Sequence, residues 1–332
     1  MSERRLDPTT GEWVEFAAPV PPATRPARGC ALCQVAATMP PGAVAVVGDG
    51  EADPAAPPTP GPPSSDLYQV EPVGGAAETV VYAAGHTTTL VDIGPEGVRR
   101  VVEVWADRYA ELGARDGVGY VLAFEDGGEP SGPDGLHPHG HVRGFPEAPP
   151  LVGRELEVAT GHLRRTGRCV RCEVVHREQS DPVRVVADNR SFVAVVPFWA
   201  RHPFEVQLLS RRHATSLLDL TDPERSALAE ILHATVAGYE RLAEPPTPYR
   251  LAVHQAPTDD GEHLSVSHLH LELALVRGPV AGAAGHLAAS GPAAGAPAAD
   301  VLPEMAATTF REALQESRTT QTLPDSPPSA TR

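Results

Sequence analysis

The sequence predicts a duplicated α+β fold, in which each half has an antiparallel sheet and packed helices. Three observations predict it: two Cys-x-x-Cys pairs of identical spacing, two related histidine segments after them, and two alternating histidine segments further on. In both halves these elements come in the same order, with an amphipathic helical pattern and an apolar strand pattern between them. The ordered series indicates an internal repeat. The 332 residues are enough for about two domains.

The repeated elements align one by one. The histidine segments share His, Thr, Leu and Asp and read His86-Thr-Thr-Thr-Leu-Val-Asp-Ile93 and His213-Ala-Thr-Ser-Leu-Leu-Asp-Leu220. We then expect helices over residues 96–115 and 222–243, and strands over residues 119–124 and 249–254. The alternating segments that follow, His137-Pro-His139-Gly-His141 and His268-Leu-His270-Leu-Glu272, are typical of strands. The halves are therefore expected at residues 1–155 and 156–316.

Composition limits the classes of function. Apolar residues make up 41% of the chain and charged residues 21%, which permits a large core and excludes wholesale disorder. The net charge is −16, and all 27 basic residues are arginines. The absence of lysine excludes a P-loop lysine and a Schiff-base lysine. An acidic chain is also a poor match for nucleic acid, because nucleic-acid binding depends on neutralising phosphates.

Targeting signals are not evident in the sequence. The N-terminal residues lack the apolar core of a signal peptide, and the longest apolar runs, such as residues 192–197, have the length of a strand. We therefore expect a soluble, cytoplasmic protein without a membrane segment. Residues 48–65 and 278–299 are rich in Pro, Gly and Ala and are expected to be irregular, and residues 317–332 to form a disordered tail.

The cysteine pairs favour metal binding. In a reducing compartment, paired Cys-x-x-Cys motifs indicate metal before disulfide, and two thiolates with two imidazoles suit tetrahedral Zn²⁺. A redox pair begins a helix in a βαβ unit, and we expect neither pair here to do so. The repeat therefore predicts two closed, structural zinc sites, made of Cys30, Cys33, His86 and His137 and of Cys169, Cys172, His213 and His268.

The histidine triplet is the candidate catalytic element. On a strand, His137, His139 and His141 point to one face, so the triplet suits a metal site, a structural polar cluster, or a nucleophile flanked by phosphate donors. A neutral imidazole attacks phosphorus without first losing a proton, and a protonated one stabilises charge on phosphoryl oxygens. Arg25 and Arg143 are candidate phosphate partners, with a plain surface role as the alternative.

These residues resemble a known family. The triplet is similar to the signature of the histidine-triad superfamily, and the chain up to about residue 277 resembles its duplicated branch, the galactose-1-phosphate uridylyltransferases. The matching segments are LDPTTGEWV, CALC, GHTTTLVDI, VWADRYAELGAR, VLAFED, HPHGH, FVAVVPFWARHPFEVQLL, VHQAP and SHLHLEL.

The resemblance implies a ping-pong reaction in a homodimer. His139 matches the nucleophile that attacks the α-phosphorus of UDP-glucose to form a uridylyl-histidine, which then passes the uridylyl group to galactose 1-phosphate. His137 matches a zinc ligand. Some family members have a different second metal site, whose matching positions are Glu155, His254, His268 and His270. Because Cys169 and Cys172 are present, we favour the cysteine-type site.

Several positions depart from the family pattern. His141 replaces a glutamine, as in hydrolytic histidine-triad enzymes, which favours water as the acceptor. Glu125 and Asp126 fall in a substrate-binding motif in which Asp126 replaces an asparagine, and Asp134 replaces a serine or threonine. A carboxylate beside a diphosphate is unfavourable unless it is protonated or paired. Three hypotheses follow: a hexose-1-phosphate uridylyltransferase, a nucleotide-sugar or dinucleotide hydrolase or phosphorylase, and a non-catalytic zinc-binding paralogue.

Overall fold

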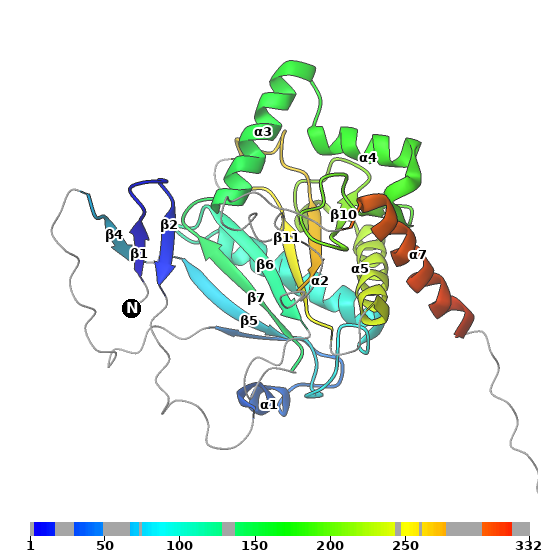
Figure 1. The fold of residues 1–332 in the computed structure, drawn as a ribbon. Coiled ribbons are helices and arrows are strands. Elements are labelled where there is room, and N and C mark those ends of the chain that lie inside the picture. Colours follow the sequence, from blue (N-terminus) through cyan, green and yellow to red (C-terminus); the bar gives the residue numbers. More distant parts are fainter. Residues whose placement is uncertain are drawn as a thin grey trace, which may run out of the picture.

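One continuous antiparallel sheet organises the molecule (Figure 1). The structure is a computed structural model that describes residues 3–16, 30–48, 67–72, 75–127, 137–242, 247–258, 261–276 and 301–320. Within these ranges nine strands pair in the order β3-β5-β7-β6-β11-β12-β10-β9-β8. The first-half strands are β3 (Ala45–Gly48), β5 (Ala76–Val81), β6 (Tyr120–Gly127) and β7 (His139–Phe145). The second-half strands are β8 (Val185–Asp188), β9 (Phe192–Val195), β10 (Val206–Ser210), β11 (Tyr249–His254) and β12 (His270–Leu275).

The strand order reveals the repeat in three dimensions. Reading outwards from the centre, β6, β7, β5 and β3 of the first half correspond to β11, β12, β10 and β9 of the second. The two halves meet where β6 pairs with β11, with Phe124 opposite Ala252. The α+β prediction is confirmed, with one addition: the strands of both halves belong to a single sheet.

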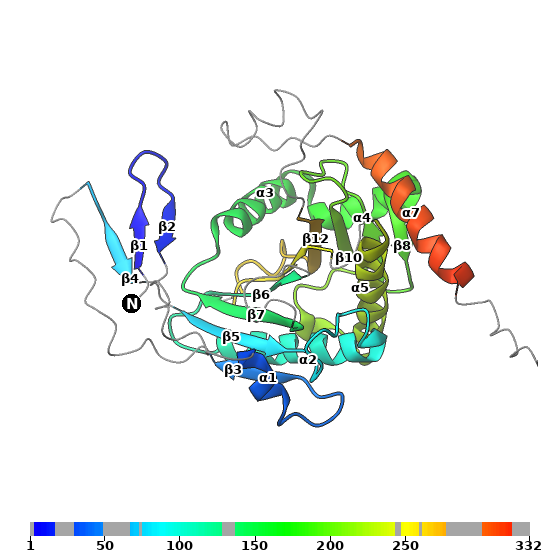
Figure 2. The same cartoon turned by 60° about the horizontal axis from the view of Figure 1, so that its bottom comes forward.

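Two long helices cover one face of this sheet (Figure 2). They are α2 (Gly94–Gly113) and α5 (Asp222–Leu242), close to the ranges expected from the sequence. On α2, Val98, Val101, Trp105 and Leu112 recur at helical spacing and are fully buried. They join the main core with the inward residues of the central strands, such as Val142 and Leu251.

Two other helices cover parts of the opposite face, which also carries the histidine triplet. These are α3 (Pro150–Thr166), which packs on Tyr120, and α4 (Val170–Ser180), whose Val175 packs on Val193 and Val195. The helix α3 ends at Gly167, whose φ of 73° is the left-handed conformation that glycine adopts readily. Short 3₁₀ turns, Pro182–Arg184 and Leu217–Asp219, complete the connections in the second half.

Several elements were not expected from the sequence. A separate three-stranded sheet joins β1 (Glu3–Leu6), β2 (Trp13–Phe16) and β4 (Val70–Pro72). The helix α7 (Pro303–Thr320) packs against α5 and extends into the predicted tail. The other residues of that tail, and most of the two irregular segments, lie outside the described ranges. No helix among the described residues is long and apolar enough to cross a membrane.

Candidate active site and metal-binding groups

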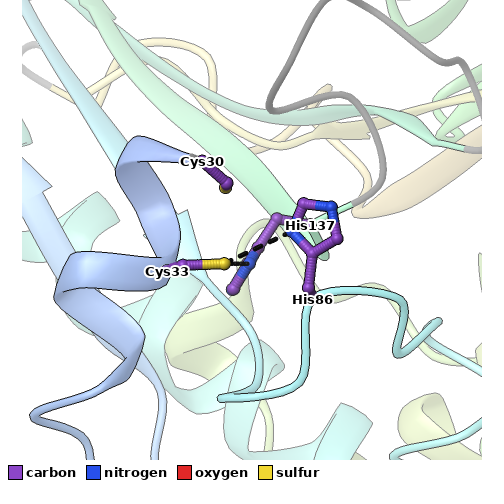
Figure 3. A group of neighbouring side chains, drawn as sticks. All are labelled: Cys30, Cys33, His86 and His137. Atoms are coloured by element: carbon purple, nitrogen blue, oxygen red, sulfur yellow. Dashed lines mark hydrogen bonds between the residues drawn. The ribbon is translucent and has the colours of Figure 1, made fainter. Parts of the chain in front are cut away.

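The first cysteine pair meets two histidines from distant parts of the chain (Figure 3). Cys30 and Cys33 flank the start of the short helix α1 (Ala31–Ala36), while His86 follows β5 and His137 precedes β7. The Sγ atom of Cys33 lies 3.3 Å from Nδ1 of His86 and 3.6 Å from Nδ1 of His137. The four ligand atoms all lie within 4.8 Å of one another.

The second cysteine pair repeats this arrangement. Cys169 and Cys172 flank the start of α4, and their Sγ atoms lie 3.7 and 3.5 Å from Nδ1 of His268. Sγ of Cys172 is also 3.6 Å from Nδ1 of His213. Both Cys30 and Cys169 occupy the N-cap of a helix, but neither helix lies in a βαβ unit, because all strand pairs in the described part of the chain are antiparallel. A helix start alone therefore does not distinguish a redox pair from a metal-binding pair. The two histidines beside each cysteine pair are what favour metal binding.

Both groups fit a tetrahedral zinc ion. With Zn–S near 2.3 Å and Zn–N near 2.0 Å, a tetrahedral S···N edge is about 3.5 Å, in agreement with the observed sulfur–nitrogen distances of 3.3–3.7 Å. The other ring nitrogen is satisfied by backbone: Nε2 of His137, His213 and His268 donates to carbonyl oxygens of Ala83, Leu264 and Ser210. This tautomer leaves each Nδ1 lone pair facing the sulfurs, as metal binding requires.

Burial favours the uncharged forms of His268 and Cys172 in the second group. It lowers the pKa of His268 to about 4, so its Nδ1 lone pair is free at neutral pH. Burial and the neighbouring Cys169 thiol raise the pKa of Cys172 to about 12. A metal ion would reverse this preference by stabilising the thiolate.

The remaining histidines of the triplet share the sheet face covered by α3. His139 begins β7, and its Nδ1 donates to the carbonyl oxygen of His137 at 2.7 Å. The Nε2 atom of His139 therefore carries the lone pair. The ring of His141 lies 5.2 Å, centroid to centroid, from both His139 and Phe124. Both histidines are partly exposed, so their face is accessible to a ligand.

Gly140 lies against a buried polar cluster behind the histidines. A Cβ atom at Gly140 would come within 1.9 Å of the Tyr82 hydroxyl oxygen, so only glycine fits. Next to it, the hydroxyl of Tyr249 donates to Oε1 of Glu125 at 2.6 Å. Burial raises the pKa of Glu125 to about 7. Glu125 thus lies on the α2/α5 face, and the structure does not bring it to the histidine face where a substrate contact was expected.

The other predicted substrate contacts have different placements. Arg143, two residues beyond His141 on β7, shares the histidine face; it pairs with Glu15 at 2.7 Å and stacks on Phe145. Asp126 also shares this face, and it pairs with Arg250 of β11 at 2.8 Å. Arg25 and Asp134 lie outside the described residues.

A third cluster lies in the second half, on the same sheet face. His254 and His270 have ring centroids 4.7 Å apart, and Nδ1 of His254 lies 3.2 Å from Oε2 of Glu155. Arg171 holds the other oxygen of Glu155 at 2.9 Å. The alternative metal scheme joined these residues to His268, but the structure separates them, because Nδ1 of His268 faces the cysteines. The cluster lines a cavity of about 420 Å³ under α3 and α4.

Two polar residues of this face were not predicted from the sequence as site residues. Glu272 accepts from Gln207 at 2.8 Å and from Arg201 at 2.9 Å, and it lies 3.8 Å from Nε2 of His254. Arg250 is the partner of Asp126. Alternation along the two strands could have placed both residues on this face, because Glu272 follows His270 by two positions and Arg250 precedes His254 by four.

Comparison with known proteins identifies the family. The family model of the C-terminal domain of galactose-1-phosphate uridyl transferase matches residues 155–322, and that of the N-terminal domain matches residues 52–145. The galactose-1-phosphate uridylyltransferase of Cryptococcus neoformans var. neoformans serotype D is 32% identical over 264 residues, which cover 76% of this chain and 68% of that protein. The chain belongs to the galactose-1-phosphate uridylyltransferase family.

Solved structures agree with this assignment. A uridylyltransferase structure is 29% identical, with a TM-score of 0.78, and the match covers 95% of this chain and 99% of that one. An ADP-glucose phosphorylase from Arabidopsis thaliana shares the fold at 22% identity, with a TM-score of 0.68 over 94% of this chain and 99% of that one.

The galactose-1-phosphate uridylyltransferase of Thermotoga maritima is 32% identical over 209 residues, or 62% of this chain, and only 64% of its own length is spanned.

Proposed function

We propose that this protein is a nucleotidyltransferase, a UDP-glucose:hexose-1-phosphate uridylyltransferase that works through a uridylyl-histidine on His139. The observation that carries the proposal is the hydrogen bond from Nδ1 of His139 to the carbonyl oxygen of His137 at 2.7 Å. It fixes the tautomer in which Nε2 is the nucleophile, on a partly exposed strand of a family member.

The reaction has two displacements at phosphorus. The Nε2 lone pair of His139 forms a bond to the α-phosphorus, while the bond from that phosphorus to the bridging oxygen breaks and glucose 1-phosphate leaves with the electron pair. A phosphate oxygen of the hexose 1-phosphate then attacks the same phosphorus and releases Nε2. A protonated His141, whose ring neighbours His139, supplies an N–H to the phosphoryl oxygens.

Each chain would bind two zinc ions, each held by two cysteines and two histidines, and the first ion would anchor the start of the strand that carries the nucleophile. The support is the tetrahedral spacing of both groups and the position of His137, two residues before His139. When bound, zinc supplies a rigid cross-link, since all four ligands come from protein. Elemental analysis that finds no zinc in the purified protein would overturn this assignment.

The proposed unit is a homodimer, and each chain in it has two domain-like halves, residues 1–155 and 156–316. Family resemblance suggests the dimer, and exposed Leu151, Val158 and Trp199, which line the second-half cavity, support an apolar contact there. Trp199→Glu should then yield monomers in sedimentation experiments, while an unchanged sedimentation coefficient would exclude this surface.

The covalent intermediate provides the test. Intact-mass spectrometry after brief incubation with UDP-glucose should show one added uridylyl group on the wild type and none on His139→Gly. A wild type that gains no mass and leaves UDP-glucose unconsumed would reject the proposal in favour of a non-catalytic zinc-binding paralogue.

A second candidate is hydrolysis or phosphorolysis of a nucleotide sugar or dinucleotide, and His141 is the observation that favours it. In place of an amide, an imidazole beside His139 can take a proton from water. His141→Gln should then raise the ratio of transfer to hydrolysis, measured as sugar-phosphate exchange against release of UMP. An unchanged ratio would exclude His141 as the determinant.

A further inference from the structure

We infer that Arg250, held in place by Asp126, is a phosphate-binding residue of the His139 site and is supplied by the second half of the chain. The inference rests on the proposed function, because it names a residue that binds the phosphates of the nucleotide.

Strand register places Arg250 on the histidine face. His141 pairs with Phe124, Phe124 pairs with Ala252, and Arg250 pairs with Asp126 two residues along. Directly opposed residues in neighbouring strands point to the same side of a sheet, so all these side chains share one face. Extending the same register by two residues brings Asp126 opposite His139.

The separation suits a phosphate between the two groups. Arg250 and His139 belong to strands on either side of β6, so their backbones lie about 10 Å apart, twice the spacing between neighbouring strands. The side chain of Asp126 lies on the strand between them, so a phosphate that contacts both groups would lie on the solvent side of the Asp126–Arg250 ion pair. The guanidinium then contacts one phosphate while Nε2 of His139 attacks the neighbouring one.

The ion pair leaves the guanidinium available. Asp126 accepts only the Nε–H of Arg250, at 2.8 Å, and within the described ranges the two Nη groups make no hydrogen bond. The side chain of Arg250 is 67% exposed and that of Asp126 is 52% exposed. An ion pair this exposed contributes little to stability. An Nε-anchored guanidinium instead presents its remaining donors in a fixed fork, which matches phosphate oxygens.

The Arg250–Asp126 ion pair also explains how a carboxylate at position 126 can lie beside a diphosphate. A lone carboxylate beside His139 would repel a diphosphate, but Arg250 neutralises it and adds donors. The chain has no lysine, so arginines must provide the positive charge, and Arg143 on the same face is already engaged by Glu15. Asp126 is therefore a positioning residue that acts through Arg250.

Nucleotide binding tests the inference independently of turnover. The Kd of UDP is measured by titration calorimetry for the wild type, Arg250→Met, Arg250→Lys and Asp126→Asn, with Arg241→Met as control, because Arg241 is exposed on α5, which packs on the other face. Loss of a charge-assisted hydrogen bond should raise the Kd about 10- to 100-fold in Arg250→Met and not in the control. Arg250→Lys should recover part of the affinity.

A second comparison tests whether Asp126 acts through Arg250. If Asp126 acts through Arg250, the effects of Asp126→Asn and Arg250→Met on the Kd of UDP should not be additive in a double-mutant cycle, whereas additive effects would show that Asp126 does not position Arg250. An equal Kd for wild type and Arg250→Met, in a protein that binds UDP and forms the histidine adduct, would overturn this inference and leave the proposed function intact. A wild type that neither binds UDP nor forms the adduct would reject both.

Discussion

Nδ1 of His139 donates to the carbonyl oxygen of His137 at 2.7 Å, and His270 makes the same bond to His268 at 2.8 Å in the second half. The same backbone geometry thus orients two histidines in different surroundings. His139 is partly exposed, whereas His270 is 3% exposed and burial holds its pKa well below the ordinary value. Of the two histidines, His139 is therefore the more accessible to a substrate.

This difference makes a matched pair of variants informative. His139→Asn should reduce turnover of UDP-glucose by at least about 10³-fold, because the proposed nucleophile is lost. His270→Asn should still form the uridylyl adduct, because its ring is enclosed under α3 and α4. The measurement is the initial rate together with intact mass. An adduct on the His139→Asn protein would show that a different residue is the nucleophile.

Loss of a single cysteine should remove a single zinc. Cys33→Ser and Cys172→Ser should each retain about one zinc per chain and unfold at a lower temperature, since each breaks one four-ligand group. His176→Asn, an exposed histidine on α4, serves as control and should retain both ions. Elemental analysis and thermal unfolding make the comparison. Full zinc content in both cysteine variants would contradict the assigned ligands.

The buried carboxyl of Glu125 should make stability depend on pH. Burial raises its pKa from 4.5 to about 7, so between these values the unfolded chain loses the proton that the folded chain keeps. The contribution of Glu125 is complete below pH 4.5 and is lost as pH rises through about 7, by the order of 3 kcal/mol.

Glu125→Gln removes this titration and keeps an acceptor for Tyr249. Relative to the wild type, the variant should therefore gain unfolding free energy between pH 5 and pH 8, as measured by denaturant titration. A constant difference between the two proteins at both pH values would mean that Glu125 is ionised in the folded state.

The contact between Gly140 and Tyr82 predicts a specific rescue. Gly140→Ala places a methyl group 1.9 Å from the Tyr82 hydroxyl oxygen and should destabilise the protein by about 1–3 kcal/mol while it displaces His139. Adding Tyr82→Phe removes that oxygen and should restore part of both stability and activity. Strict additivity of the two substitutions in a double-mutant cycle would exclude the clash as the cause.

Local patterns and the repeat predicted much of the fold and site. The duplicated order of Cys-x-x-Cys, His and alternating histidines was enough to assemble both four-ligand groups, because each half supplies the register for the other. Periodicity located α2, α5 and β11 closely. The pairing of β6 with β11 was not predictable in this way, because it joins segments 124 residues apart.

Because this pairing was not predictable, the partners of Asp126 and Glu125 on β11 were not predicted either. Both carboxyls were read as substrate contacts, yet one side of β6 points to the histidine face and the other to the core, where Tyr249 accommodates Glu125. The N-terminal three-stranded sheet was missed for a related reason: its strands are three or four residues long, too short for a periodic signal.

The central pairing also governs how the chain can be divided. Cutting the protein near residue 155 would leave β6 and β11 each as an edge strand with a row of unpaired backbone N–H and C=O groups. Such an edge is a template for pairing with a further strand, whether from the missing half or from another copy of the same fragment. The proposed site would be divided as well, since His139 would remain in one fragment and Arg250 in the other.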